Sequence, residues 1–401
     1  MSDKPAIVYL SYDGMTEPLG QSQVIAYLEG LAKDYAIHLV SFEKERERND
    51  PAKMAYVRER LKKAGISWTP LAYHKAPSAP ATAYDITIGA MAATWIALRT
   101  GAKIVHARSY PPALMALPVK YIARAKLLFD MRGLWADERV DGGVWPVGGT
   151  IYRVTKSLES TFLRAADHVV TLTHASEREI ASFDYLQPTP PSITVIPTCA
   201  DLQMFSPRPR PEGPFTFGYV GSFGTWYLVD ETMMFFRALL AREPEARMLF
   251  VNRNEHDAIR GAAARADIPA DRIEIVAVEH RDVASYVARM DAAAALIKPV
   301  YSKIASAPTK LAEYLGCGVP CIGNAGVGDM VEILEGRQVG AILRDFGPAS
   351  IDEAVGKLLT LTRDPATKAR CIETAQSLFS LEEGVAAYRR IYGELLAGAE
   401  A

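Results

Sequence analysis

The residues of this sequence that are best suited to chemistry lie in the segment from Lys298 to Tyr314. The segment follows an apolar run, residues 292–297, that is typical of a buried strand. Pro308 is expected at, or close to, the first position of a helix. Thr309 and Lys310 would then stand in the first turn, where unpaired backbone amides and the helix dipole attract an anion. The segment therefore predicts an anion-binding site.

The same helix offers a group that could bind hydroxyls. Glu313 lies four residues after Thr309, so both side chains face one side of the helix, one turn apart. Its carboxylate would reach past the anion, as a carboxylate that binds a ribose diol does. A diphosphate joined to a ribose is a ligand that satisfies both ends. The alternative is an ordinary capped surface helix with a Lys–Glu pair, and in either case Ser306 or Ala307 is expected at the cap.

Three further segments follow predicted strands. Gly20, in the loop 11–23, would let an anion approach the amides of the next helix; the alternative is an ordinary turn. His106 stands at the end of the strand 104–107, where a lone histidine is also a common structural residue. In the segment 130–139, Arg132 could bind a phosphate or a hydroxyl, or pair with an acid in a solvated loop.

The glycine-rich loop 218–224 excludes some cofactors. Its glycines are spaced three apart, which does not match the dinucleotide fingerprint G-x-G-x-x-G, so a nicotinamide or flavin oxidoreductase is disfavoured. The chain contains no P-loop and no G-x-S-x-G elbow. Its seven histidines form no ligand-spaced cluster, so we expect no metal.

The composition is that of an ordinary globular protein. The chain has 401 residues, 49% of them apolar, with 45 Lys and Arg against 47 Asp and Glu. This near-neutral charge argues against a nucleic-acid partner. The four cysteines are expected to be small buried residues of a reducing, cytosolic protein. We see no signal peptide, and the longest apolar stretch, residues 86–98, is shorter than a bilayer requires.

The elements that must position these residues are strands and helices in alternation. Strands are expected at 6–10, 37–42, 104–107, 127–131, 168–173 and 193–197, and again at 215–220, 248–251, 273–278, 292–297, 319–323 and 340–343. Continuous apolar strands separated by helix-length segments predict a parallel sheet covered by helices. A proline-rich stretch interrupts the alternation, which indicates two domains that face a cleft. We therefore expect an N-terminal α/β domain at 1–200, a linker at 201–214, a second α/β domain at 215–380 and a returning helix at 381–401.

Two long segments resemble the group 1, or family 4, glycosyltransferases of GT-B fold. One is Ser306–Pro320 (SAPTKLAEYLGCGVP) and the other is Val195–Pro207 (VIPTCADLQMFSP). The opening Gly20–Gln23 and the strand 169–173 also fit, so that the resemblance covers essentially the whole chain. It implies two Rossmann-like doubly wound domains, with a C-terminal helix that crosses back to the first.

The resemblance also implies the activity and its residues. A nucleotide-diphosphate-sugar donor would bind mainly to the second domain, and the sugar would pass, with retention and without a metal, to an acceptor on the first. Exopolysaccharide or other glycoconjugate assembly is suggested by analogy alone. The protein is expected in the cytoplasm, with peripheral contact at the inner face of the membrane as an alternative. The roles are assigned as follows: Thr309 and Lys310 to the diphosphate, together with Ser222, Lys303 and Ser306; Glu313 to the ribose; Gly20 to the phosphate or acceptor; His106 to the transferred sugar; Arg132 and Glu138 to the acceptor or sugar side.

The chain departs from the family pattern at two points. The family often has two glutamates eight residues apart, and the first of these positions is Ala305 here. The family also often has Arg and Lys after the first strand of the second domain, whereas the stretch 222–228 has neither. Lys303, Arg253 or Lys298 could supply the missing charge.

Other interpretations remain open. A catalytically silent nucleotide-sugar-binding protein would fit the missing cations, and a sugar-nucleotide epimerase could share the architecture. Lys120, Arg124 and Lys126, beside Tyr121 and Ile122, could form a small basic and apolar surface for peripheral membrane contact, or simply a solvated helix face. The donor sugar, its base and the acceptor are not indicated by the sequence.

Overall fold

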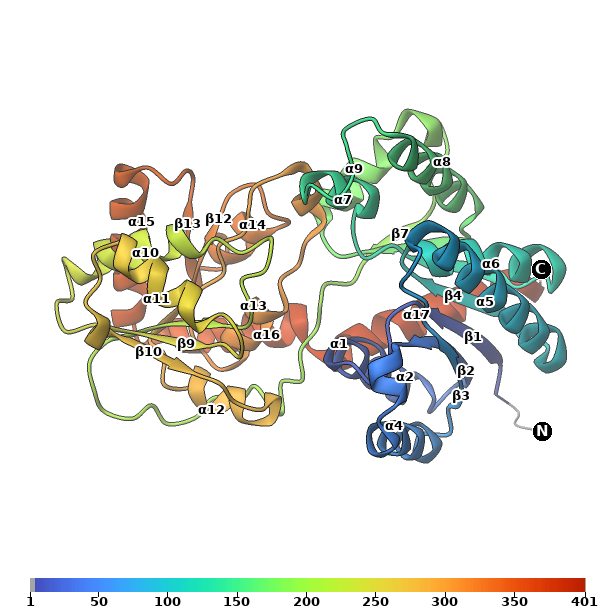
Figure 1. Ribbon diagram of the computed structural model, residues 1–401, viewed down its shortest axis with the longest axis horizontal. Coiled ribbons are helices and arrows are strands. Elements are labelled where there is room, and N and C mark those ends of the chain that lie inside the picture. Colours follow the sequence, from blue (N-terminus) through green and yellow to red (C-terminus); the bar gives the residue numbers. More distant parts are fainter. Residues whose placement is uncertain (1–3, 401) are drawn as a thin grey trace. The chain divides into compact units, whose positions relative to one another are not determined.

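The computed structural model describes residues 4–400, which form two compact units (Figure 1). The first unit contains the chain up to Pro197 together with the segment from Leu381 onward. The second unit is Thr198–Ser380. The proline-rich stretch therefore belongs with the second unit, where the Arg210 guanidinium donates a hydrogen bond to Asp291 Oδ2 (2.7 Å).

The first unit is built on a seven-stranded parallel sheet in the order β3-β2-β1-β4-β5-β6-β7. One edge strand, β3, was not predicted. Its Pro70 lacks the amide that a central strand needs, and an edge strand tolerates this loss. The strands are β1 (Ala6–Ser11), β2 (Ala36–Glu43), β3 (Ser67–Ala72), β4 (Ile104–Arg108), β5 (Lys126–Asp130), β6 (His168–Thr171) and β7 (Ile193–Val195).

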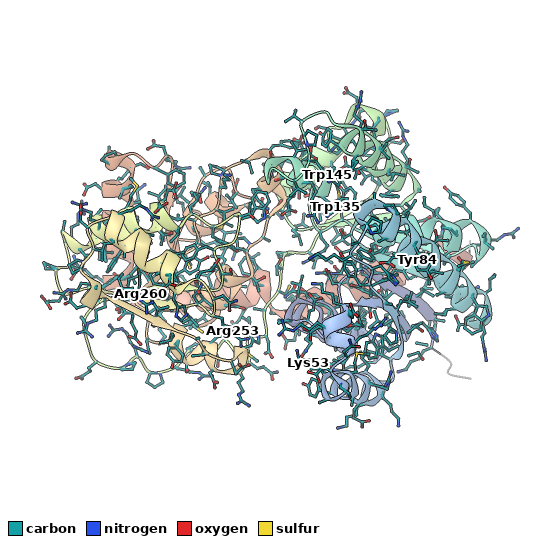
Figure 2. The ribbon with its side chains drawn as sticks, in the orientation of Figure 1. Lys53, Tyr84, Trp135, Trp145, Arg253 and Arg260 are labelled. Carbon is teal, nitrogen blue, oxygen red and sulfur yellow. The ribbon has the colours of Figure 1, made fainter. Side chains whose placement is uncertain are left out.

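Helices connect these strands as crossovers. The first crossover begins as a short α-helix, passes through one π-helical turn and continues as α-helix. Trp135, at the start of α7 (Trp135–Asp141), and Trp145, in the turn after it, pack edge to face with ring centroids 5.3 Å apart (Figure 2). The helices are α1 (Pro18–Gly20), the π-turn η1 (Gln21–Ile25), α2 (Ala26–Leu31), α3 (Glu45–Arg48), α4 (Pro51–Lys63), α5 (Ser78–Thr100), α6 (Tyr110–Ile122), α7 (Trp135–Asp141), α8 (Thr150–Ala165), α9 (His174–Ala181) and the 3-10 turn η2 (Asp184–Leu186).

The last helix, α17 (Leu381–Glu400), belongs to the first unit although it follows the second in the chain. It lies along α2, where Arg389 Nε pairs with Asp34 at 2.7 Å. Tyr388 and Tyr392 are buried at its inner side. This confirms the predicted returning helix.

The second unit is built on a six-stranded parallel sheet in the order β10-β9-β8-β11-β12-β13. Its strands are β8 (Thr216–Val220), β9 (Arg247–Val251), β10 (Ile273–Val276), β11 (Ala292–Ala294), β12 (Cys321–Asn324) and β13 (Gly340–Leu343). Its helices are α10 (Val229–Leu240), α11 (His256–Arg265), η3 (Ala270–Arg272), η4 (His280–Asp282), α12 (Val283–Val287), η5 (Tyr301–Ala305), α13 (Thr309–Gly316), α14 (Met330–Leu334), α15 (Pro348–Arg363) and α16 (Ala366–Phe379). Both sheets confirm the doubly wound α/β class.

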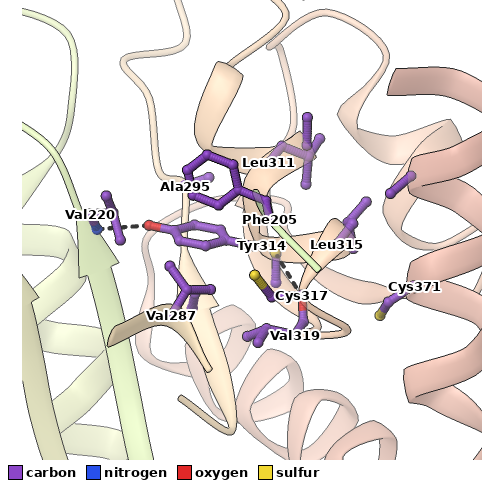
Figure 3. Packing of buried hydrophobic residues seen from close by; sticks show 14 of the residues in the cluster. Phe205, Val220, Val287, Ala295, Leu311, Tyr314, Leu315, Cys317, Val319 and Cys371 are labelled. Carbon is purple, nitrogen blue, oxygen red and sulfur yellow. Dashed lines mark hydrogen bonds between the residues drawn. The ribbon is translucent and has the colours of Figure 1, made fainter. Parts of the chain in front are cut away.

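The core of the second unit fixes α13 against the sheet. Tyr314 is completely buried, and its hydroxyl accepts a hydrogen bond from the Val220 amide of β8 (2.8 Å; Figure 3). Cys317 and Cys371 lie in the same cluster, and all four cysteines are buried, as expected. The end of the glycine-rich strand and the start of α13 are therefore held in register by one buried side chain.

Two local expectations were wrong. Pro308 lies next to the first helical position of α13, Thr309, as expected, but it is itself the N-cap in place of Ser306 or Ala307. The apolar run 86–98 is part of a longer helix, α5, whose segment Ala79–Thr100 is long and apolar enough to cross a membrane by length and composition alone. The sequence pattern underestimated this helix because Thr82, Asp85 and Thr87 interrupt its first turns.

Candidate donor and acceptor sites

The loop that follows β8 is shaped by one carboxylate. Glu255 accepts hydrogen bonds from the amides of Phe223 (2.9 Å) and Gly224 (3.1 Å) and from Asn252 Nδ2 (2.7 Å). Burial would raise the pKa of Glu255, but these donors and the Ser222 hydroxyl prevail and hold it at about 2. Glu255 thus remains an anion, bound to the backbone amides of the glycine-rich loop.

Lys310 lies beneath the start of this loop. Its Nζ is buried, has no hydrogen-bond partner, and lies 3.8 Å and 3.4 Å from the ring centroids of Tyr219 and Tyr227. Gly221, at φ 99°, passes above it, so that a Cβ placed there would be 3.8 Å from the ammonium. Burial lowers the pKa of Lys310 well below its usual value, and Glu313 and Glu255 only partly oppose this shift. The site therefore holds a desolvated amine that lacks an anionic hydrogen-bond acceptor.

Glu313 is buried one turn further along α13. Burial raises its pKa to about 7, although the neighbouring Lys310 acts in the opposite direction. Lys310 and Glu313 are therefore an adjacent buried pair, and burial favours the neutral form of each. An anion beside Lys310, or hydroxyls beside Glu313, would supply the partners that water no longer provides.

A second ammonium approaches the same loop. Lys303, in η5, is buried, and its Nζ lies 3.6 Å from the ring centroid of Trp226. Trp226 and Tyr227 are consecutive, so the aromatic pair holds Lys303 and Lys310 on adjacent rings. Arg253 is instead bonded to the Val278 carbonyl (3.0 Å) and to Glu279 (3.1 Å), and Lys298 is exposed. Of the three candidates for the missing charge, Lys303 is the one beside the loop.

The remaining predicted residues of this unit lie around the same loop and helix start. Thr309 is half-buried at the first position of α13. The Ser306 amide donates to the Lys303 carbonyl (3.1 Å), which joins the helix start to η5. Ser222 is exposed in the loop that Glu255 holds. The predicted roles of these residues in binding a nucleotide-sugar donor stay predictions.

In the first unit, the loop after β1 is held in a similar way. Buried Glu43, at the end of β2, accepts hydrogen bonds from the amides of Met15 (2.8 Å) and Thr16 (3.3 Å) and from the Thr16 hydroxyl (2.7 Å). Gly20 packs so tightly against this loop that a Cβ would lie 2.1 Å from the Gly14 carbonyl oxygen. Position 20 therefore requires glycine for close packing, independently of any role of this residue in ligand binding.

His106 lies at the end of β4, beneath α17. It is 1% exposed, and its Nδ1 is 2.8 Å from the Tyr392 hydroxyl. Its Nε2 is 3.6 Å from Asp130 Oδ2, beyond hydrogen-bond distance. Burial lowers the pKa of His106, although Asp130 partly opposes this shift. The neutral ring therefore has one bonded nitrogen and one without a hydrogen bond.

Asp130 is the centre of a buried charge cluster. It is fully buried and accepts a hydrogen bond from the Tyr388 hydroxyl (3.0 Å), with Arg108 Nη1 at 3.5 Å and Arg132 Nη1 at 3.9 Å. Burial would raise the pKa of Asp130, but Arg132, His106 and Arg108 together lower it to about 2. Two cations thus share one carboxylate.

The backbone at these strand ends is unusual. Ser109, directly after β4, has φ 74°, and Arg132, two residues after β5, has φ 60°. Such conformations in residues other than glycine cost of order 1–3 kcal/mol each and concentrate at functional sites. Glu138 follows on α7 and is half-buried. The roles of Arg132 and Glu138 toward a ligand stay predictions.

The structure thus groups the predicted residues by unit. Ser222, Lys303, Ser306, Thr309, Lys310 and Glu313 lie around the loop after β8 and the start of α13, whereas Gly20, His106, Arg132 and Glu138 belong to the first unit. Sequence reasoning did not identify Glu255, Tyr219, Trp226, Tyr227, Tyr388 or Tyr392. In the sequence, the aromatic residues cannot be distinguished from ordinary core residues. No motif around Glu255 indicates that its carboxylate bonds the glycine-rich loop some thirty residues earlier. Among residues 4–400, no three His, Cys, Asp or Glu side chains are grouped to hold a metal.

Two family models together match most of the chain. The glycosyl transferase 4-like domain matches residues 23–199, and the glycosyl transferases group 1 model matches residues 203–378. No curated protein matches the sequence.

Solved structures share the fold at low sequence identity. Sucrose-phosphate synthase from Thermosynechococcus elongatus is 16% identical, covering 98% of this chain and 100% of that chain, with a TM-score of 0.71. A glycosyltransferase from Rickettsia africae is 14% identical (98% and 99% covered, TM-score 0.70). Anabaena HepE in complex with UDP and glucose is 14% identical (96% and 99% covered, TM-score 0.64).

These likenesses and the two parallel sheets establish the GT-B fold. The family models extend over both units and include the loop after β8, the start of α13 and the strand ends that carry His106 and Asp130. The chain belongs to the group 1, family 4-type glycosyltransferases.

Proposed function

We propose that this glycosyltransferase takes its sugar from a nucleoside diphosphate sugar that binds to the second unit, and transfers it with retention and without a metal. The observation that carries the proposal is the buried Lys310 ammonium, which has no hydrogen-bond partner, beside a buried Glu313. A diphosphate would give Lys310 its missing acceptor, and a ribose diol would give Glu313 its donors. One ligand thereby satisfies both groups.

The aromatic pair explains how the site accommodates its two buried lysines before the donor binds. Trp226 and Tyr227 place π-faces against Lys303 and Lys310, which partly replaces lost hydration. A diphosphate offers stronger, charge-assisted hydrogen bonds than a ring does. The two lysines therefore fill the role of the Arg and Lys that the stretch 222–228 lacks.

The proposed chemistry depends on stabilisation of the leaving group and does not require a side-chain base. The bond between the anomeric carbon and the diphosphate oxygen breaks, and the acceptor hydroxyl oxygen bonds to the same face of that carbon. The hydroxyl proton passes to the departing diphosphate oxygen. Lys310, Lys303 and the first-turn amides of α13 would stabilise the charge that grows on the diphosphate.

The acceptor is assigned to the first unit. Arg132 is only 14% exposed, and the Asp130 carboxylate, 3.9 Å from its Nη1, is shared with Arg108. The cluster could therefore receive a hydroxyl or an anionic group of a glycan, a lipid-linked sugar or another glycoconjugate. His106 would contact the transferred sugar, and Gly20 and Glu138 would line the acceptor or phosphate side.

A donor-binding protein without turnover is the second candidate. Glu255 already occupies the amides of Phe223 and Gly224, which a donor phosphate would otherwise use. If the carboxylate stays there, the donor binds with fewer contacts to its leaving group.

A turnover assay separates the two candidates. UDP-glucose is the first donor to test, because UDP and glucose are bound in the HepE neighbour. We expect release of nucleoside diphosphate in the presence of a glycan acceptor and a chelator, with the anomeric configuration of the product retained by NMR. Lys310→Ala and Glu313→Ala should each lower the rate on the order of a hundredfold or more, whereas Lys357→Ala, an exposed control, should not. Donor binding without turnover on any acceptor would favour the second candidate.

A further inference from the structure

The helix α5 has an apolar outer side. Tyr84, Met91, Trp95 and Leu98 recur at intervals of seven, four and three residues, which places them on one helix face. Each is 57 to 59% exposed, and Figure 2 labels Tyr84 on this helix. Four large apolar side chains on one exposed helix face are more than the scattered single residues of an ordinary surface.

The inner side of α5 is fixed in the fold. Asp85 is buried and accepts hydrogen bonds from the Tyr12 hydroxyl and the His74 amide, both at 2.9 Å. Gly89 packs so closely on α6 that a Cβ would lie 2.6 Å from Met115 Sδ. The helix therefore cannot leave the sheet without breaking the core, and only its outer side is available to a partner.

The end of α6 extends the same surface. Its last residues, Tyr121 and Ile122, are 66% and 61% exposed. The Lys126 amide donates to the Lys103 carbonyl (2.8 Å), so the chain segments that follow α5 and α6 meet at the amino-terminal edge of the sheet (Figure 1). We call this surface the α5–α6 face, and its apolar residues are Tyr84, Met91, Trp95, Leu98, Tyr121 and Ile122.

The charge of this region is entirely of one sign. From Ile86 to Phe129 the chain has six Lys and Arg and no Asp or Glu. Arg108 is buried, and Lys120 and Lys126 pair with Asp167. Arg99, Lys103 and Arg124 are exposed, and within residues 4–400 none of them has a carboxylate partner. Arg99 lies over the Trp95 ring, 5.1 Å from its centroid.

We propose that the α5–α6 face rests on the surface of a bilayer that contains anionic lipid. Aromatic and aliphatic side chains would enter the headgroup region, and Arg99, Lys103 and Arg124 would bind lipid phosphates. The segment Ala79–Thr100 has the length and composition of a spanning helix, but 33% of an 18-residue apolar stretch within it is buried inside the fold. It therefore lies along the interface and does not cross it.

The charge distinguishes this surface from the other apolar patch of the first unit. Val144, Val147, Ile151 and Val154 are also exposed. The chain around them, residues 137–159, has four acidic and three basic residues. An anionic bilayer would bind the α5–α6 face in preference to the patch formed by Val144, Val147, Ile151 and Val154. That patch therefore serves as a matched control.

The test is co-sedimentation of the full chain with vesicles of phosphatidylcholine, alone or mixed with phosphatidylglycerol. We expect binding to the mixed vesicles that weakens with added salt. Trp95→Gln with Leu98→Gln should lower the partition coefficient on the order of tenfold to a hundredfold. Lys103→Gln and Arg124→Gln should each lower it about fivefold. The control Val147→Gln with Ile151→Gln should bind as the wild type does.

Folding and location are checked separately. The substituted side chains are exposed, so the circular dichroism spectra and unfolding midpoints should not change. Brominated lipids should quench Trp95 in the wild type, and Trp95→Phe should lose that quenching whereas Trp145→Phe keeps it. The proposal is overturned if mixed vesicles do not sediment the wild type, or if the control pair loses binding instead. A soluble dimer that Trp95→Gln with Leu98→Gln disrupts, without any vesicle binding, would assign the face to a second copy of the chain.

Discussion

Burial drives Lys310 and Glu313 toward their neutral forms. The two side chains lie on adjacent turns of α13, and burial is the largest cause of both pKa shifts. Their mutual attraction opposes burial without overcoming it. A pair of this kind costs free energy in the empty protein and recovers it when a ligand supplies charge and hydrogen bonds.

At the scale of this residue pair, the stability of the free protein should depend on pH through Glu313. Its pKa is about 7 in the folded protein against 4.5 for an exposed glutamate. A raised carboxyl pKa means that the folded state binds the proton more tightly, so stability falls as the pH rises from about 4.5 to about 7. The loss is on the order of 3 kcal/mol, and the opposing effect of Lys310 is already contained in this shift.

Urea unfolding of the wild type and Glu313→Gln across this pH range measures the effect. The difference in free energy of unfolding between the two proteins should change with pH, in favour of the wild type at low pH. The other carboxylates cancel in this difference. Parallel curves would show that Glu313 titrates as an exposed group.

At the scale of elements, each unit holds the loop after its first strand with a glutamate from the neighbouring strand or just beyond it. Glu43 ends β2 and bonds the amides of Met15 and Thr16, and Glu255 follows β9 and bonds those of Phe223 and Gly224. In both cases one carboxylate accepts hydrogen bonds from two consecutive backbone amides. Each loop is therefore already bonded to an anionic group of the chain itself.

Replacing Glu255 tests this arrangement. Glu255→Gln keeps the size but removes the charge and one acceptor, so the Phe223 and Gly224 amides should exchange with solvent faster. The free energy of unfolding should fall by about 1–2 kcal/mol. Hydrogen exchange of the two amides is the direct measurement, with Glu279→Gln as an exposed control. Unchanged protection in Glu255→Gln would show that the loop does not depend on this carboxylate.

The helices and strands were largely predictable from the sequence, whereas the contacts between the side chains of the candidate sites were not. Continuous apolar strands and amphipathic helices identify a parallel sheet because both patterns are local. The edge strand β3 was missed because of Pro70, and α5 was underestimated because polar residues interrupt its apolar run. The motif around Lys310 was recognised, but its contacts with Tyr219 and Tyr227 depend on residues about ninety positions away.

At the scale of the whole molecule, the order of the chain links the two units. The chain leaves the first unit at Pro197, forms the second, and returns at Leu381. In the returning helix α17, the Tyr388 hydroxyl donates a hydrogen bond to the buried Asp130 carboxylate. The Tyr392 hydroxyl is hydrogen-bonded to the buried His106 ring. The conformation of these two buried residues of the first unit thus depends on a segment that follows the second unit in sequence.

The central claim is that the second unit binds a nucleoside diphosphate through Lys310. Calorimetric titration with UDP, GDP, ADP and TDP, in two buffers of different ionisation enthalpy, tests it most directly. Because the free pKa of Lys310 is lowered and an anion would raise it, binding should take up a proton and weaken as the pH rises. We predict that one nucleotide binds to the wild type with proton uptake. In Lys310→Met the uptake should disappear and the affinity should fall on the order of tenfold to a hundredfold. The control Lys357→Met should bind as the wild type does. Binding with the same uptake in Lys310→Met, or no binding of any nucleotide to the wild type, would contradict the claim.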